Sequence, residues 1–414
     1  MFRKEYLNNG IPVVMESFKN VRSVAIGIWV KVGSRHETSE RNGISHFLEH
    51  MFFKGTKKRT VKDIAVDIDS MGGDLNAFTS RENTAFYVKI IEEYLESGVE
   101  LLTDIFVNSI FSEEEIEKEK KIIKEEIKMV EDTPDDYIHD LFSRTVWGRE
   151  GLGQTILGRR ETIASFSRAD IMKHIRTYYG TKDIVVACAG FFSQDKLLDM
   201  LNRNLGGLRQ GTEPKTGTSA AFTKNIKVFP KKLSEAHICI GVPSLSQDHE
   251  ERYALFVLNT ILGAGVSSRL FQEIREKKGL AYSVYSFTSS YTDTGLWAVY
   301  AGVSKKKIRE TAELIIAEML NLPGTLTDSE LERAKNHLKG NLILGLESTS
   351  SRMNNLARQE IYFKKYISPD EIMKSVGMVS IGQIKELANR LICRENFAIT
   401  AYGDLPVDIL EGVV

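Results

Sequence analysis

The sequence contains little cysteine, which bears on where the protein works. Its three cysteines, Cys188, Cys239 and Cys393, form an odd and widely spaced set, and the first two lie in apolar stretches. Such a set argues against a disulfide framework and is typical of a reducing compartment. We therefore expect small buried side chains at these positions.

An excess of charge and long hydrophobic runs are also missing. The 55 Lys and Arg residues nearly cancel the 56 Asp and Glu residues, for a formal net charge of −1. A balanced chain offers no basic surplus for nucleic acid or anionic lipid. No window reaches about 18 uncharged apolar residues, and the first residues hold no apolar stretch of signal-peptide length. We expect a cytoplasmic or matrix-like protein that binds neither nucleic acid nor membrane.

The chain has enough apolar sequence for more than one core. Hydrophobic residues make up 42% and charged residues 27% of its 414 residues, and this length exceeds that of one ordinary domain. The clearest linker signal is the stretch 209–223, which is rich in Gly, Thr, Ser and Pro and has no apolar periodicity. We predict a first half over residues 1–210, a linker over 211–225 and a second half over 226–414.

Both halves follow the same order of elements: strand, helix, short turn and a long capped helix. Ser112 and Thr327 each precede a long charged helix, and Glu115 lies at the capping-box position after Ser112. We predict an α+β fold of two homologous halves, each an antiparallel sheet packed with helices. The expected strands are 2–8, 11–17, 24–32, 75–79, 83–90, 183–190, 236–242 and 296–303. The expected helices are 43–53, 62–71, 92–108, 113–130, 250–262, 305–320 and the one after Thr327.

The sharpest local pattern is His46-Phe47-Leu48-Glu49-His50, an HxxEH motif. On a helix, positions i and i+4 share a face, so both imidazoles can point to one metal ion. Zinc needs neutral imidazole nitrogens, one more protein ligand and an open position for water. Glu49 lies next to the second histidine and is placed to take a proton from such a water. The alternative is a polar helix face with two ordinary surface histidines.

A third ligand must come from elsewhere in the chain. The long helix after Ser112 has many glutamates, and Glu119 and Glu126 are seven residues apart, two turns along one face. Most glutamates of this helix must be solvated surface charges. The residues alone do not choose among them.

Three stretches together resemble the pitrilysin-type metallopeptidases, most closely the processing-peptidase β-subunit group. They are NGISHFLEHMFFKGT, GGDLNAFTSRENTAFYV and EIEKEKKIIKEEI. The resemblance covers nearly the whole chain and implies one Zn²⁺ held by His46, His50 and Glu126. It implies that Glu49 is the general base and that Glu119 is a nearby carboxylate that supports the site without binding the metal itself.

The same resemblance assigns substrate contacts. Asn76, Ala77 and Phe78 would lie on a strand beside the zinc and pair with the substrate backbone, although an ordinary strand after the Gly72-Gly73 turn is the alternative. Arg275 and Tyr282, seven residues apart, would hold a peptide carbonyl or the developing oxyanion. For an isolated Arg or Tyr, a surface ion pair or a core aromatic is the alternative.

The second half contains no HxxEH motif, so we expect one zinc ion per chain. The resemblance implies a zinc endopeptidase whose chamber, formed between the halves or between two chains, receives extended peptides or unfolded protein. It also implies a homodimer. The rival hypotheses are a non-catalytic scaffold or partner subunit, and a chain that is active only with a different partner chain. The sequence does not identify the physiological substrate.

Overall fold

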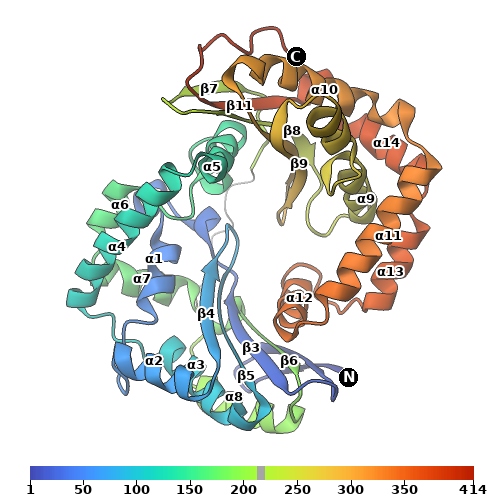
Figure 1. Ribbon diagram of the computed structural model, residues 1–414. Coiled ribbons are helices and arrows are strands. Elements are labelled where there is room, and N and C mark those ends of the chain that lie inside the picture. Colours follow the sequence, from blue (N-terminus) through green and yellow to red (C-terminus); the bar gives the residue numbers. More distant parts are fainter. Residues whose placement is uncertain (212–219) are drawn as a thin grey trace. The chain divides into compact units, whose positions relative to one another are not determined.

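In the computed structural model, which describes residues 1–211 and 220–414, the strands form two sheets (Figure 1). The first sheet has six strands and the second has five. The order across the first sheet is β1 (Phe2–Tyr6), β2 (Pro12–Ser17), β6 (Ile184–Gly190), β3 (Ser23–Val30), β5 (Thr84–Ile91) and β4 (Asp74–Thr79). The order across the second is β7 (Ile226–Pro230), β11 (Ala398–Gly403), β8 (Ala236–Ser244), β10 (Gly295–Val303) and β9 (Ala281–Ser290).

The two sheets repeat one topology. In each, the last strand in sequence lies between two early strands and runs parallel to the outer of them, as β6 does beside β2 and β11 beside β7. All other neighbours are antiparallel. The predicted α+β fold is confirmed, but each sheet contains this one parallel pair. A parallel pair needs a long connection, and the helices before β6 and β11 provide it.

Strand β3 shows why the first sheet is covered on both faces. Every residue from Val24 to Val30 is buried, so the strand reads as a continuous apolar run. Val24, Ile26 and Ile28 pack into one hydrophobic core, while Ala25 and Trp29 pack into another on the opposite face. This division follows from the two-residue period of a strand.

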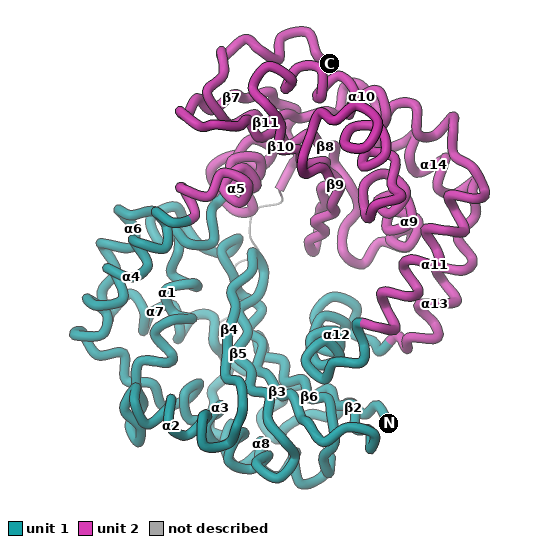
Figure 2. The backbone as a smooth tube through the Cα atoms, in the orientation of Figure 1, with its two compact units in different colours: residues 1–129, 154–218, 345–366 teal, residues 130–153, 219–344, 367–414 magenta. Residues whose placement is uncertain are grey.

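The chain forms two compact units that do not follow its midpoint (Figure 2). Unit 1 comprises Met1–Met129, Gln154–Thr218 and Gly345–Tyr366, and unit 2 comprises Val130–Gly153, Ser219–Leu344 and Ile367–Val414. Each half of the sequence therefore contributes one segment to the unit built mainly from the other half. The linker expected at residues 211–225 lies largely outside the described residues.

Two helices carry out this exchange. Helix α5 (Pro134–Trp147) packs against β8 and β11 of unit 2, and helix α12 (Thr349–Tyr362) packs against β2, β3 and β6 of unit 1. A buried polar group ties down the end of α12. The Tyr362 hydroxyl donates to Glu82 at 3.0 Å and accepts from the Asn83 amide at 3.0 Å, and Arg35 pairs with Glu82 at 2.7 Å.

The long helices begin where the sequence predicts. The Ser112 hydroxyl accepts from the Glu115 amide and the Thr327 hydroxyl from the Glu330 amide, both at 3.3 Å. The remaining helices of unit 1 are α1 (Ile44–Met51), α2 (Val61–Ser70), α3 (Leu95–Asn108), α4 (Glu113–Glu131, reaching into unit 2), α6 (Arg160–Ser165), α7 (Arg168–Tyr178) and α8 (Gln194–Leu205). Those of unit 2 are α9 (Arg252–Gly263), α10 (Ile308–Thr325), α11 (Asp328–Gly345), α13 (Pro369–Met378) and α14 (Ile381–Leu391).

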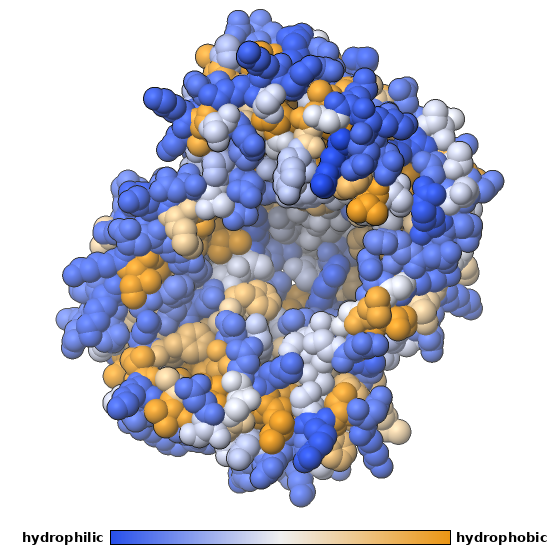
Figure 3. Space-filling model, in the orientation of Figure 1, coloured by the Kyte–Doolittle hydropathy of each residue, from blue (hydrophilic) through white to orange (hydrophobic). Residues whose placement is uncertain are grey.

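The surface agrees with the balanced composition. Hydrophilic residues cover most of the face shown in Figure 3, and hydrophobic ones gather over α2 and α3, where Val61 and Val66 of α2 are exposed. Among residues 1–211 and 220–414, no helix is both long and apolar enough to cross a lipid bilayer.

Candidate metal centre

Helix α1 carries the HxxEH motif with its apolar side held in the core of unit 1. Phe47, Leu48 and Met51 are buried in that core. The opposite side presents His46 and His50, whose ring centroids are 4.6 Å apart. His46 is only 6% exposed, so it is not the surface histidine of the alternative interpretation.

Helix α4 brings the third group. Ile116, Ile123 and Ile127 fasten it to the same core. Glu126 then faces both imidazoles, with 3.7 Å from one carboxylate oxygen to His46 Nε2 and 3.7 Å from the other to His50 Nε2. The potential ligand atoms of these three residues all lie within 4.8 Å of one another, and they are the one such group in the described part of the chain.

Glu119 lies behind His50 on the same face of α4. Its carboxylate is buried, lies 2.8 Å from His50 Nδ1 and forms an ion pair with Lys54 Nζ at 2.8 Å. A proton on Nδ1, donated to this carboxylate, leaves the lone pair of His50 Nε2 free on the side of Glu126. This contact between Glu119 and His50 Nδ1 is compatible with the role in supporting the site that the resemblance implies.

The electrostatics of the cluster follow from burial and from these pairs. Burial, with repulsion from His50, lowers the pKa of His46 to about 3, so His46 is neutral at neutral pH. Burial acts to lower the pKa of His50, but the hydrogen bond and charge of Glu119 raise it overall. Burial acts to raise the pKa of Glu119, but His50 and Lys54 lower it overall. Burial raises the pKa of Glu126.

Glu49 lies on the same helix as His46 and His50 but is not part of the possible ligand group. Burial raises the pKa of its carboxyl group, while hydrogen bonds from Thr79, at the end of β4, act in the opposite direction. One carboxylate oxygen is buried with no hydrogen-bond partner among the described residues. A raised pKa brings this carboxylate closer to neutral pH, as a general base requires.

The cluster fits a zinc ion. One carboxylate oxygen of Glu126, which lies 3.7 Å from His50 Nε2, is buried and has no hydrogen-bond partner among the described residues. Unpartnered buried polar atoms are costly unless a further group satisfies them. Two imidazoles and one carboxylate are the donor set of catalytic zinc sites that keep an open position.

The proposed substrate residues lie in two places. Asn76, Ala77 and Phe78 belong to β4, the edge strand of the first sheet, which pairs with β5 alone among the described strands. Arg275 and Tyr282 lie in unit 2. They are close together there, with the guanidinium 5.3 Å from the centroid of the Tyr282 ring. Tyr282 is 84% exposed.

Sequence reasoning missed two residues that support the centre. Lys54 pairs with Glu119, and Glu37 binds the start of α1 through hydrogen bonds from the backbone of Gly43 and Ser45. A signal for the second exists, because α1 follows a glycine and has no Ser, Thr, Asp or Asn at its N-cap. A short helix without a local cap implies a cap from elsewhere.

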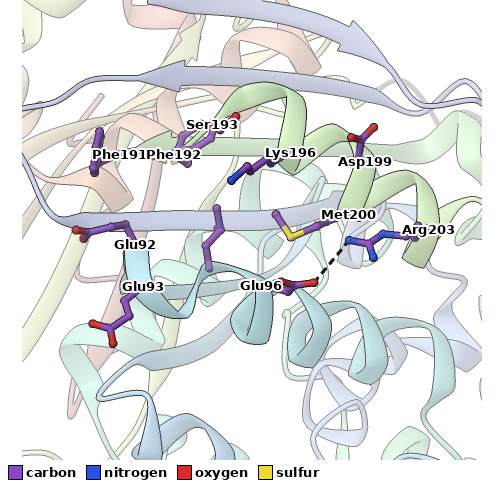
Figure 4. Close-up of a pocket in the computed structure, with 11 residues that line it drawn as sticks. Glu92, Glu93, Glu96, Phe191, Phe192, Ser193, Lys196, Asp199, Met200 and Arg203 are labelled. Carbon is purple, nitrogen blue, oxygen red and sulfur yellow. Dashed lines mark ion pairs between the residues drawn. The ribbon is translucent and has the colours of Figure 1, made fainter.

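A separate cavity of about 730 Å³ lies in unit 1 between the starts of α3 and α8 (Figure 4). Acidic Glu93 and Glu96 and basic Lys196 and Arg203 line it, and Arg203 pairs with Glu96 at 3.7 Å. It shares no residue with the metal cluster.

Comparisons with known proteins identify the family of this chain. Residues 12–160 match the family described as insulinase (peptidase family M16), and residues 165–338 match the peptidase M16 inactive domain. The chain is 41% identical to the uncharacterized zinc protease YmxG of Bacillus subtilis, over 98% of this chain and 100% of the relative. It is 37% identical to the uncharacterized zinc protease SCO5738 of Streptomyces coelicolor, over 95% and 87%.

Solved structures give the same fold. A protease from Helicobacter pylori superposes with a TM-score of 0.91 at 23% identity, over 97% of this chain and 99% of that one. A peptidase M16 inactive domain from Pseudomonas fluorescens also superposes with a TM-score of 0.91, at 17% identity. The resemblance seen in the sequence is confirmed: the chain belongs to the M16 (insulinase/pitrilysin) family of zinc proteases.

Proposed function

We propose that this protein is a zinc-dependent endopeptidase that cleaves extended peptides, with His46, His50 and Glu126 as metal ligands and Glu49 as general base. The proposal is carried by the convergence of the potential ligand atoms of His46, His50 and Glu126 within 4.8 Å of one another. Glu49, which lies on α1 with the two histidines, has one buried carboxylate oxygen without a hydrogen-bond partner among the described residues. One such group supports one zinc ion per chain.

The residues of the site have separate tasks. Zinc held by this donor set supplies Lewis-acid chemistry, polarising an oxygen ligand and lowering the pKa of water towards about 7. Glu49 accepts a proton from the attacking water and then donates it to the leaving amine nitrogen. Glu119 holds His50 in the tautomer that leaves Nε2 unprotonated, and Lys54 compensates the charge of Glu119.

Substrate binding uses the free edge of β4. An extended peptide that adds to this edge would pair with the backbone of Asn76, Ala77 and Phe78, a mode that depends little on side chains. Arg275 and Tyr282 offer a guanidinium and a hydroxyl as donors to a peptide carbonyl or to the oxyanion that forms from it. The proposed substrates are therefore peptides or unfolded protein segments, and the proposed working form is a homodimer.

The test is cleavage of a quenched fluorescent peptide library by the wild type and by Glu49→Gln, with zinc content measured on both. Glu40→Gln, at an exposed glutamate, is the matched control. We expect Glu49→Gln to retain about one zinc per chain and to lose roughly 10²–10⁴-fold in kcat/KM, the usual contribution of a general base. The control should cleave like the wild type.

Two outcomes would overturn the proposal. If Glu49→Gln is as active as the wild type, Glu49 is not the general base. If the wild type binds no metal or cleaves no peptide, the scaffold hypothesis is favoured. The mass of the lone purified chain, measured together with its activity, separates the homodimer from a requirement for a different partner.

A further inference from the structure

The start of helix α1 has an unusual construction. Its N-cap residue, Gly43, has a left-handed backbone with φ of +95° and no side chain to cap the helix. A Cβ at this position would lie 2.6 Å from the Cα of Gly158 and 2.8 Å from the Leu157 carbonyl oxygen. Only glycine fits there, so no residue with a capping side chain can occupy the N-cap.

The buried carboxylate of Glu37 supplies the missing cap. It accepts hydrogen bonds from the Gly43 amide at 2.7 Å and the Ser45 amide at 2.8 Å. It also accepts one from the Asn42 side chain at 3.1 Å. Glu37 is 7% exposed, so these bonds replace hydration that the carboxylate has lost. A negative charge at this end also complements the helix dipole.

The cap is itself fixed to the rest of unit 1. The Asn42 side chain donates to the Thr155 carbonyl at 2.8 Å, and the Asn42 carbonyl accepts from the Thr162 hydroxyl at 2.7 Å. The backbone of Gly158 lies against Asn42 and Gly43 so closely that neither glycine has room for a side chain. Glu37 therefore joins the first turn of α1 to a rigid frame.

This first turn matters because α1 has only eight residues and His46 is the third of them. The backbone amides of a first turn have no partners within the helix. Without Glu37, the amide of Ser45, next to His46, would lose its partner. His50 lies in the last turn and has Glu119 as an independent support.

We propose that Glu37 is a positioning residue that caps the metal-binding helix from outside it and thereby holds His46 in its ligating position. This inference rests on the proposed function for its consequence in catalysis, but the cap itself can be measured without metal.

The experiment compares Glu37→Gln with the wild type in two measurements. In zinc-free protein, hydrogen exchange of the Gly43 and Ser45 amides reports the cap directly. In zinc-loaded protein, competition with a chelator reports affinity. A Gln side chain has an NH₂ group in place of one carboxylate oxygen, so it cannot accept hydrogen bonds from both backbone amides through separate oxygens. We therefore expect hydrogen exchange of the Gly43 and Ser45 amides to become at least about 10-fold faster. We expect zinc affinity to fall about 10–100-fold, as for other supports of metal ligands.

Two controls separate positioning from general destabilisation. Glu40→Gln makes the same charge change at an exposed site and should alter neither measurement. Val24→Ala, at a fully buried position of β3, should lower Tm but leave zinc affinity unchanged. If Glu37→Gln does not fold, Glu37→Asp retains the charge with a shorter reach and replaces it in both measurements.

The inference fails if Glu37→Gln exchanges and binds zinc like Glu40→Gln, or if its loss of affinity is no greater than that of Val24→Ala at equal loss of Tm. A wild type that binds no zinc would overturn the proposed function, while the exchange measurement would still decide whether Glu37 caps the helix.

Discussion

The two sheets of this protein share one order over five strands, yet the proposed metal ligands lie on helices beside only the first. In unit 1, the helix that follows β3 carries His46, Glu49 and His50. In unit 2, the helix that follows β8 is α9, and its buried positions include Leu255, Leu258 and Leu262. The same architecture therefore supports a helix with two histidines and a glutamate on one side in unit 1 and a mainly apolar helix in unit 2.

The long helices differ in the same way. Aligning Ser112 with Thr327 places Ala334 opposite Glu119 and Asn341 opposite Glu126. Ala334 is buried, and the Asn341 amide lies 3.0 Å from His337 of its own helix. A few side chains on the repeated frame, rather than the frame itself, distinguish the two units.

The largest expected effect is on zinc affinity, when the proposed ligand Glu126 is replaced by asparagine, the residue at the aligned position 341 of unit 2. Glu126→Asn removes the carboxylate that faces both imidazoles. We expect zinc affinity to fall more than about 100-fold, beyond the loss for an outer support, and cleavage to fall with it. Chelator competition measures the affinity. Exposed Glu125→Asn is the control, and equal affinity for Glu125→Asn and Glu126→Asn would contradict the ligand assignment.

A smaller effect is expected from Glu119→Ala, which introduces the residue found at position 334. His50 would lose the acceptor at its Nδ1, and Lys54 would lose its partner. We expect zinc affinity to fall about 10–100-fold while some binding remains. The same competition assay measures it, with Glu125→Ala as the control. A loss as large as that of Glu126→Asn would instead make Glu119 a ligand.

The stability of unit 1 in acid depends on His174, which is buried. Burial lowers the pKa of its imidazole to about 3. Below pH 6.5 the unfolded chain protonates this group, whereas the folded chain stays neutral until about pH 3. Stability from His174 is therefore complete above pH 6.5 and falls as the pH drops, by up to about 1.4 kcal/mol per pH unit.

The measurement is the free energy of unfolding of zinc-free wild type and His174→Phe between pH 7 and 5. The variant should lose less stability on acidification, whatever its stability at pH 7. The corresponding case in unit 2 is His237, whose pKa is also lowered by burial. Unlike His174, His237 has a hydroxyl, that of Tyr300, 2.9 Å from its Nδ1. Parallel curves for the wild type and the variant would show that His174 does not remain neutral.

The smallest effect is expected from the reverse exchange. Asn341→Glu gives α11 a carboxylate at the position that corresponds to Glu126, but α9 has no histidines to join it. We expect the zinc content to stay at about one per chain, as measured by metal analysis. A second zinc ion would show that unit 2 retains other ligands.

Much of this structure was predictable, because local patterns control it. The HxxEH spacing indicates the metal helix, and Ser112 and Thr327 cap the long helices as predicted. The choice of Glu126 as third ligand needed the family resemblance, because α4 contains many glutamates and the sequence alone does not single out one of them. Three strands, β7, β9 and β11, were not predicted. The sequence of β9 is mostly polar, and its edge position needs no alternation of apolar residues.

The exchange of α5 and α12 between units was not predictable. Each is an amphipathic helix, and an apolar face does not indicate which of two similar sheets it will cover. Glu37 was missed for a related reason. Its role depends on the chain returning to Gly43 and Gly158, a contact between residues far apart in the sequence.

The exchanged helix α12 also has a consequence for how the protein is made. The face of the first sheet formed by Val14, Ala25 and Trp29 is covered by Met353, Leu356 and Ala357. The ribosome adds about 5–20 residues per second. The roughly 150 residues between the end of the second segment of unit 1 and the end of its third therefore take about 7–30 s to synthesise. During that interval the first sheet has an apolar face without its covering helix, and the nascent chain needs protection from aggregation until α12 arrives.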